Sequence, residues 1–433
     1  MSSAKFDQRR RTRLWLTVGI LAVVTFALAT AAVLWTSDGD APVAHSYEEL
    51  TGSVFAPPPR GPFQAPQVKE LRLPRFPGAL SIWGATGRDF RGHIWFGVSS
   101  ASAGSSARLF EYDPGTDAWV DHGGVVDKLK DIGLARNGQG QNKIHSKIVP
   151  AGDGWLYFAS TDEEGESPRG DVLPRWGGHL WRVHPVRRVW QHLLATPEGL
   201  VAVSGVGRYV YALGYWGHVL YQYDTETGRN RRVVVGSVDG HVSRNFLADL
   251  RGHAYVPRLR RLPSGDVTVG LVEYDVDLRE VAETPMPAYL GRVNPQSHHG
   301  IVGLAYLPDG KLLFTTHVGQ LYRIEPRQGM PAAVTALGDW PLQAPAYAPS
   351  LFALGGRDWI AGVAQTGTGF QWVAAELATG ASAAFPLDLQ GLDKVLLYGS
   401  VGRDNAGRAY VGGWAADGIG GQRPLLLQID PGG

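Results

Sequence analysis

Polar and histidine-bearing segments stand directly before several apolar, strand-like runs of this 433-residue chain. A polar group that enters a protein core costs free energy unless it is paired, so these segments either hydrogen-bond inside the protein or face a wet channel. In such a channel His145 or Tyr398 could act as a general base. Arg244 or His299 could neutralise a developing negative charge. The further residues expected around a ligand are Trp83, Gln141, Asn142, His241, Gln296 and His298.

A divalent cation is one ligand that part of this set could hold. Gln296, His298 and His299 could converge on a metal ion if they lie in a loop. In a strand, however, His298 and His299 would point to opposite faces and could not bind one ion. The spacing alone is weak, so no metal ligand is assigned and the cofactor stays unknown.

One pattern recurs seven times in the chain and would position these residues. Each copy has a turn of the form Asp-x-x-Gly or Asp-Gly, a strand that ends in an aromatic residue, and a second strand that often closes in Asp-Pro or Thr-Gly. Glycine makes up 57 of the 433 residues, about twice the usual share, as many tight turns require. The copies begin at Asp89, Asp153, Gly207, Asp249, Asp309, Gly356 and Asp404.

Seven copies between residues 67 and 433 leave about 52 residues for each, which is typical of a four-stranded propeller blade. The sequence therefore predicts an all-β, seven-bladed β-propeller over residues 67–433. In such a ring the innermost strand of each blade precedes the turn, so the polar segments would gather around the central axis. The strand expected at residues 68–73 could pair with the last copy and close the ring.

The motif Asp-x-x-Gly-x-Ile-Trp-Phe-Gly at residues 89–97 resembles the repeats of virginiamycin B lyase-like propellers, and regulator-type propellers carry similar repeats. The resemblance covers nearly all of residues 67–433, at the level of the repeat alone. It implies the fold and, as one alternative, a lyase that eliminates across an acidic glycan or a lactone. The other alternative is a binding or scaffold protein whose funnel face holds a ligand or a protein partner.

A quinone cofactor is not expected. Asp224 to Gly228 match the Asp-x-x-Thr-Gly strand ends of pyrroloquinoline-quinone propellers. Those propellers usually have eight blades and a docking Trp a few residues later, where this chain has Arg229, Asn230 and Arg231. The adjacent cysteine pair of their dehydrogenases is also missing.

The N-terminus predicts the compartment. Residues 1–13 hold five basic residues against Asp7, and an uncharged run follows from 14 to 35. As a helix of about 1.5 Å per residue this run would cross a bilayer core. The basic flank places the N-terminus in the cytoplasm, so we expect a single-pass signal anchor in the cytoplasmic (inner) membrane, with the propeller in the periplasm or extracellular space. Cleavage as a signal peptide, for which residues 27–31 offer small-x-small sites, and a buried soluble helix remain open.

Residues 36–66 contain six prolines and predict a stiff, extended tether. The charge balance of 41 basic to 40 acidic residues argues against nucleic acid as a partner, and the absence of cysteine excludes disulfides and thiolate zinc sites. A tethered propeller suits an envelope complex. The acidic loop 162–166 and the basic stretch 258–261 could be partner patches, or plain solvated loops.

Overall fold

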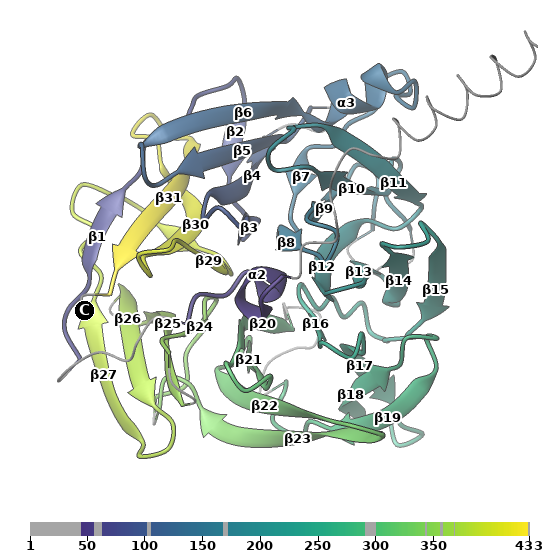
Figure 1. Cartoon of the computed structure of the whole chain (residues 1–433), viewed down its shortest axis with the longest axis vertical. Coiled ribbons are helices and arrows are strands. Elements are labelled where there is room, and N and C mark those ends of the chain that lie inside the picture. The colour runs from purple at the N-terminus through teal and green to yellow at the C-terminus, as the bar shows by residue number, and fades with distance from the viewer. Residues whose placement is uncertain are drawn as a thin grey trace, which may run out of the picture. The chain divides into compact units, whose positions relative to one another are not determined.

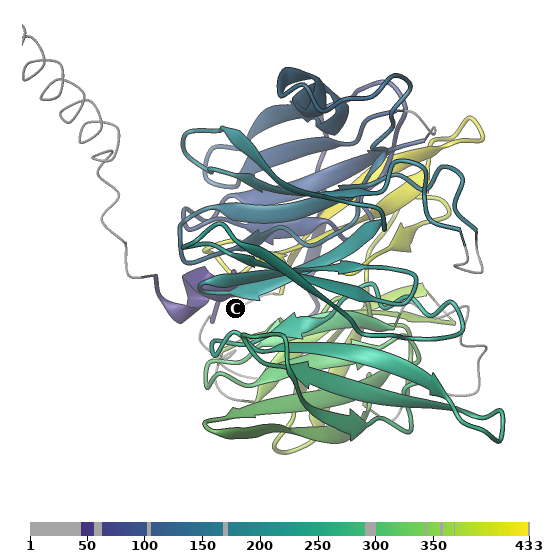
Figure 2. The ribbon, with the colours of Figure 1, turned by 90° about the vertical axis from the view of Figure 1, so that its right-hand side faces the viewer.

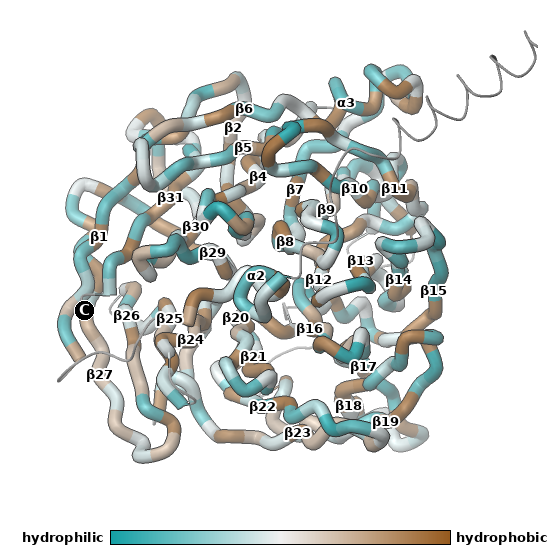
Figure 3. Tube along the Cα trace, viewed as in Figure 1, coloured by the Kyte–Doolittle hydropathy of each residue, from teal (hydrophilic) through white to brown (hydrophobic). Residues whose placement is uncertain are grey.

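Seven antiparallel sheets surround one central axis in the computed structural model (Figure 1). The structure describes residues 45–55, 63–101, 105–167, 172–290, 300–342, 344–355, 358–367 and 369–431. The predicted seven-bladed β-propeller is therefore confirmed. Hydrophobic residues recur along the strands of every blade (Figure 3), which lets neighbouring blades bury their faces against each other.

Each blade is a sheet of four or five strands that follow one another from the axis outward. The first blade consists of β2(Ala79–Ser81), β3(Thr86–Arg88), β4(Ile94–Ser100), β5(Arg108–Asp113) and β6(Ala118–Gly124), and the second of β7(Lys143–Ile144), β8(Val149–Pro150), β9(Leu156–Thr161), β10(Gly178–Val183) and β11(Trp190–Thr196). The third blade consists of β12(Leu200–Val206), β13(Tyr209–Gly214), β14(Val219–Asp224) and β15(Asn230–Val234). The fourth consists of β16(Leu247–Ala248), β17(Ala254–Arg261), β18(Val267–Tyr274) and β19(Glu280–Pro285). The last three are β20(Ile301–Tyr306), β21(Leu312–Thr316), β22(Gln320–Arg327) and β23(Met330–Asp339); β24(Phe352–Ala353), β25(Trp359–Thr366), β26(Gly369–Glu376) and β27(Ala381–Pro386); and β28(Leu396–Leu397) and β29(Gly402–Arg403) with β30(Ala409–Ala416), β31(Gln422–Asp430) and β1(Gln67–Glu70).

The ring closes where β1, from the beginning of the described body, pairs antiparallel with β31 near its end. Val68 lies opposite Ile429 in this register, and Ile429 is fully buried. The closing strand was predicted over residues 68–73, and the observed pairing covers residues 67–70.

Where the repeat has its aspartate, this residue holds the turn together, as Asp249 illustrates. Its Oδ1 accepts from the backbone N–H groups of Arg251 and His253, and its Oδ2 accepts from the Arg251 guanidinium and the Tyr255 hydroxyl. His253 in turn contacts the Glu273 carboxylate at 2.7 Å. This network explains why aspartate, arginine and an aromatic residue recur at fixed spacing.

Two helices accompany the sheets in the residues that the structure describes. The sequence did not predict α3(Val125–Asp131), which follows β6 and buries Val125 and Leu129. The other, α2(Tyr47–Thr51), begins with a capping box between Ser46 and Glu49 and lies over the centre of one face of the ring (Figures 1 and 2).

No helix in the described part of the chain is long and apolar enough to span a membrane. The predicted basic tail 1–13 and the predicted span 14–35 lie outside the described residues. Of the predicted tether 36–66, the structure describes residues 45–55 and 63–66.

Candidate functional site

A cavity of about 310 Å³ lies at the axis, where the inner strands begin. We call it the loop-side cavity. Four of the predicted site residues, Trp83, His145, Arg244 and Tyr398, line it together. The remaining lining residues are Lys143, Lys147, Glu163, Asn245, Val302, Tyr347 and Gly399.

The shared topology of the blades brings these residues together. Trp83 precedes β3, Arg244 precedes β16, Tyr347 precedes β24 and Tyr398 precedes β29, each by a few residues. Residues at the same point of successive blades meet at the axis, although they are far apart in the sequence. The cavity is thus built from one position of the repeat, used in different blades.

His145 and Arg244 form the central polar contact. The Nη1 of Arg244 donates to Nε2 of His145 at 2.7 Å, and the Nδ1 of His145 lies 3.1 Å from the Val201 carbonyl oxygen. A carbonyl accepts only, so the proton of this imidazole sits on Nδ1 and the ring is neutral. Burial, reinforced by the charges of Arg244 and Lys143, holds the pKa of His145 well below its usual value. His145 therefore orients Arg244, and its lone pair is not available to a substrate in this arrangement.

Arg244 has donors left for a ligand. Its Nε is buried and has no hydrogen-bond partner among the described residues. No ion pair joins this guanidinium to any carboxylate within the same ranges. A half-buried cation without an opposite charge favours an anion beside it. An anion that entered the cavity would supply the missing acceptor.

Aromatic rings form the other wall of the cavity. The rings of Trp83 and Tyr398 lie 4.7 Å apart between centroids, and Trp414 Nε1 donates to the Tyr398 hydroxyl at 3.3 Å. Burial raises the pKa of Tyr398, so this phenol stays protonated at neutral pH. Lys143 lies over the Trp83 ring at 5.5 Å and also forms an ion pair with Glu163.

Lys147 lies at the floor of the loop-side cavity. Its Nζ donates to the carbonyl oxygens of Gly84, at 3.0 Å, and Gly399. The residue is 5% exposed, and burial lowers its pKa to about 7. With Arg244 and Lys143 it gives the cavity up to three positive charges against the single carboxylate of Glu163.

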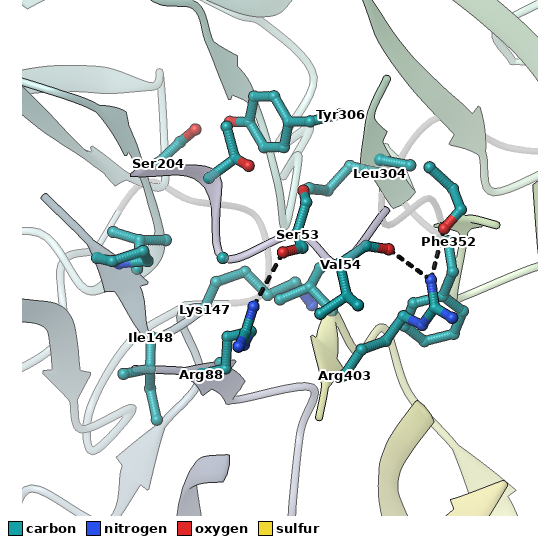
Figure 4. Close-up of a pocket in the computed structure, with 18 of the residues that line it drawn as sticks. Ser53, Val54, Arg88, Lys147, Ile148, Ser204, Leu304, Tyr306, Phe352 and Arg403 are labelled. Atoms are coloured by element: carbon teal, nitrogen blue, oxygen red, sulfur yellow. Dashed lines mark hydrogen bonds between the residues drawn. The ribbon is translucent and has the colours of Figure 1, made fainter. Parts of the chain in front are cut away.

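The opposite end of the axis is covered by residues 46–55, which we call the plug. Arg88 donates to the Ser53 carbonyl oxygen at 3.0 Å, and Arg403 donates to that of Val54 at 2.8 Å (Figure 4). A small cavity of about 50 Å³ beneath the plug is also lined by Lys147. The two arginines lie at the carboxyl ends of β3 and β29, so the plug sits at the other end of the inner strands from the loop-side cavity.

Three other predicted site residues, Gln141, Asn142 and His241, do not line the loop-side cavity. Gln141 is buried, donates to the Gly177 carbonyl oxygen and accepts from Ser160. His241 is 1% exposed and contacts Ser237 and Tyr289. Asn142 is half-buried, with a buried Oδ1 that has no partner in the described structure. Gln296, His298 and His299, and with them the suggested metal site, fall outside the described residues.

Asp89, His93 and Glu111 place three ligand-type atoms within 4.8 Å of one another. The Nη2 of Arg91 donates to both carboxylates, at 2.6 Å to Asp89 and 2.7 Å to Glu111. A cation therefore already occupies the position between them. Because the same network recurs around Asp249, we assign this cluster to the repeat and not to a metal.

The two suggested partner patches are paired inside the protein. Glu163 binds Lys143, and Glu166 accepts a hydrogen bond from Tyr215. In the basic stretch, Arg258 is 5% exposed and binds Glu280 and Glu283. Neither segment is the freely exposed charge cluster that its sequence suggested.

Sequence reasoning missed Lys147 and Tyr347. The sequence contained a signal for Lys147. Lys143, His145 and Lys147 are spaced two residues apart, and alternate residues of an extended segment point to the same side. Tyr347 lies five residues before β24, in a segment that contains none of the predicted site residues. Nothing in the sequence shows how the chain before β24 turns into the cavity.

No family model matches the chain, and no curated protein matches its sequence. Among solved structures it is similar to a protein of unknown function from Dyadobacter fermentans, with a TM-score of 0.50 and 11% identity over 84% of this chain and 99% of that one. It also resembles a fungal alcohol oxidase in complex with copper, with a TM-score of 0.47 and 11% identity over 85% of this chain and 76% of the other. At these identities the likeness concerns the fold alone.

Proposed function

We propose that the loop-side cavity binds a small anionic ligand, with Arg244 as its charge partner and the rings of Trp83 and Tyr398 as its apolar wall. The observation that carries this proposal is the guanidinium of Arg244 inside the cavity, which His145 holds in place and which has neither an ion pair nor a partner for its Nε among the described residues. A volume of about 310 Å³ suits a ligand of about one sugar ring. Sugar acids and aromatic carboxylates fit this cavity, because each has a carboxylate for Arg244 and a ring for the apolar wall.

Titration calorimetry of the full chain with galacturonate and with benzoate tests this proposal. Arg244→Met should weaken binding at least tenfold, since a charge-assisted hydrogen bond contributes about 1.5–3 kcal/mol. Arg279→Met removes an exposed arginine that pairs with Asp277 and should leave binding unchanged. Equal affinity in both variants, or no binding of either acid to the wild type, would overturn the proposal.

Lyase chemistry is the second candidate, and the presence of Tyr398 and Arg244 in one cavity favours it. Elimination needs a base that removes a proton next to a carboxylate, and a cation that stabilises the resulting charge. Of the two bases that the sequence predicts, only Tyr398 is left, because Arg244 occupies the lone pair of His145. The raised pKa of Tyr398 opposes this role, so binding without turnover is the better supported function.

Ultraviolet absorbance of an unsaturated uronate product separates the two functions. A lyase should generate this product from a polyuronate, and Tyr398→Phe should abolish its formation. If the wild type binds the sugar acid and releases no unsaturated product, the binding function stands and the lyase is rejected.

We further propose that residues 14–35 anchor the protein in the cytoplasmic membrane, with the propeller outside the cytoplasm, as the basic tail and uncharged run support. The anchor would station the propeller beside other envelope proteins. Mass spectrometry of the mature N-terminus distinguishes a retained anchor from a cleaved signal. Co-purification from solubilised membranes would reveal a stoichiometric partner, whereas a lone propeller would argue against an envelope complex.

A further inference from the structure

The surroundings of Lys147 suit a neutral amine better than an ammonium ion. An ammonium has three N–H donors, whereas a neutral amine has two donors and a lone pair. Within the described ranges, Nζ has two acceptors, the carbonyl oxygens of Gly84 and Gly399, and forms no ion pair. The two acceptors match the two donors of the amine. A pKa lowered by burial to about 7 agrees with this donor count.

The choice of lysine at this position is informative. Lysine accounts for only eight of the chain's 41 basic residues, and the other cations that line the two axial cavities are Lys143, Arg88, Arg244 and Arg403. An arginine could also donate to two carbonyl oxygens, but a guanidinium stays charged and is no nucleophile. A lysine that burial keeps partly neutral can attack a carbonyl carbon.

Space for the amine comes from two glycines. A Cβ on Gly84 would lie 3.2 Å from Nζ, and one on Gly399 would lie 3.1 Å from it. The same side chain lines the loop-side cavity, so a ligand that enters this cavity reaches the amine at its floor.

We propose that Lys147 forms an imine with a ligand that carries both a carbonyl group and a carboxylate, the carboxylate being held by Arg244. The proposal rests on the anion-binding function above and adds a covalent step to it. The amine lone pair attacks the carbonyl carbon and forms the C–N bond. The two amine protons leave with the carbonyl oxygen as water, so the step needs no oxidant or reductant.

Reductive trapping tests this proposal on the full chain. The protein is incubated with glyoxylate and cyanoborohydride, and the modified lysines are mapped by mass spectrometry. We expect one dominant adduct, at Lys147, that is lost in Lys147→Arg and kept in the matched variant Lys130→Arg, which changes an exposed lysine outside the cavity. Arg244→Met should lower the rate at which this adduct forms at least tenfold with glyoxylate. The rate with acetaldehyde, which has no carboxylate, should not change.

A measurement on the wild type avoids dependence on the folding of the Lys147 variant. The rate of labelling at Lys147 should rise with pH around a midpoint near 7, and the exposed Lys69 serves as the reference lysine in the same sample. Labelling of Lys69 without Lys147 would overturn the imine. If Lys147 is not labelled but galacturonate or benzoate still binds, the imine proposal fails and the anion-binding proposal stands. If neither acid binds but glyoxylate still labels Lys147, the anion-binding proposal fails and the imine proposal stands.

Discussion

The hydrogen bond from Arg244 to His145, 2.7 Å long, joins residues that are 99 positions apart in the sequence and belong to different blades. His145 is fixed from its other side by the Val201 carbonyl oxygen of a third blade. Three blades therefore determine where the guanidinium points. The site depends on closure of the whole ring and not on any single repeat.

His145→Leu should weaken binding of a sugar acid about tenfold, because it removes the acceptor that orients Arg244. His145→Gln can both donate to Val201 and accept from Arg244, so it should retain more of the affinity. Calorimetry on both variants, with a thermal melt to confirm folding, measures this. If the leucine and glutamine variants bind equally, His145 does not position Arg244.

Gly84→Ala should destabilise the protein far more than Gly78→Ala. The two glycines have similar φ angles, +85° and +78°, so both variants incur the same backbone strain. A Cβ on Gly84 would lie 2.1 Å from the Gly399 carbonyl oxygen, whereas one on Gly78 would meet nothing within 4 Å. We expect about 1 kcal/mol for Gly78→Ala and at least about 3 kcal/mol for Gly84→Ala, measured by urea unfolding. Similar losses in both would show that the hub adapts to the added methyl group.

Arg88→Met should loosen the plug without opening the ring, because it removes the donor to the Ser53 carbonyl oxygen. Hydrogen exchange of the amides in residues 46–55 should speed up about tenfold or more, since hydrogen bonds to charged groups contribute about 1.5–3 kcal/mol. Amides of β30 and β31 should exchange as before. Faster exchange throughout the seventh blade would instead show that Arg88 stabilises the sheet and not the plug alone.

His218 should make the protein sensitive to acid. Its Nε2 accepts from the Ser243 backbone N–H and its Nδ1 lies 3.1 Å from the Pro257 carbonyl oxygen, so the folded state holds it neutral, and burial lowers its pKa to about 4. The unfolded chain binds a proton below about pH 6.5 and the folded chain does not, so stability falls as the pH falls through this window. The loss should reach roughly 2–3 kcal/mol between pH 7 and pH 4.5.

Urea unfolding at several pH values measures this loss. His218→Asn keeps one donor and one acceptor without a titrating ring, so its stability should be lower overall but flatter over the same range. An unchanged slope in this variant would assign the acid sensitivity to other groups.

The blade number and the closing strand could be predicted because the repeat leaves regular signals. The Asp-x-x-Gly turn is visible in the sequence, and the position before each inner strand follows from it, which is how Trp83, His145, Arg244 and Tyr398 were found. His241 occupies a comparable position, yet its ring packs against Tyr289. Whether such a side chain lines the cavity or packs between blades depends on the local loop, which the repeat does not encode.

The plug could not be predicted for a different physical reason. Its capping box between Ser46 and Glu49 is visible in the sequence, but its docking depends on carbonyl oxygens that accept from Arg88 and Arg403. Every residue has a carbonyl oxygen, so the sequence carries no sign of which ones an arginine will reach.

Because residues 46–55 cover one end of the axis, the central channel is closed at that end and open only at the other. A ligand that enters the loop-side cavity beside Trp83 must leave through the same opening. A long polysaccharide could not be threaded through such a dead end and could offer only its terminal unit. The number of protein molecules that one polysaccharide can hold would then follow from its number of terminal units, whatever its length.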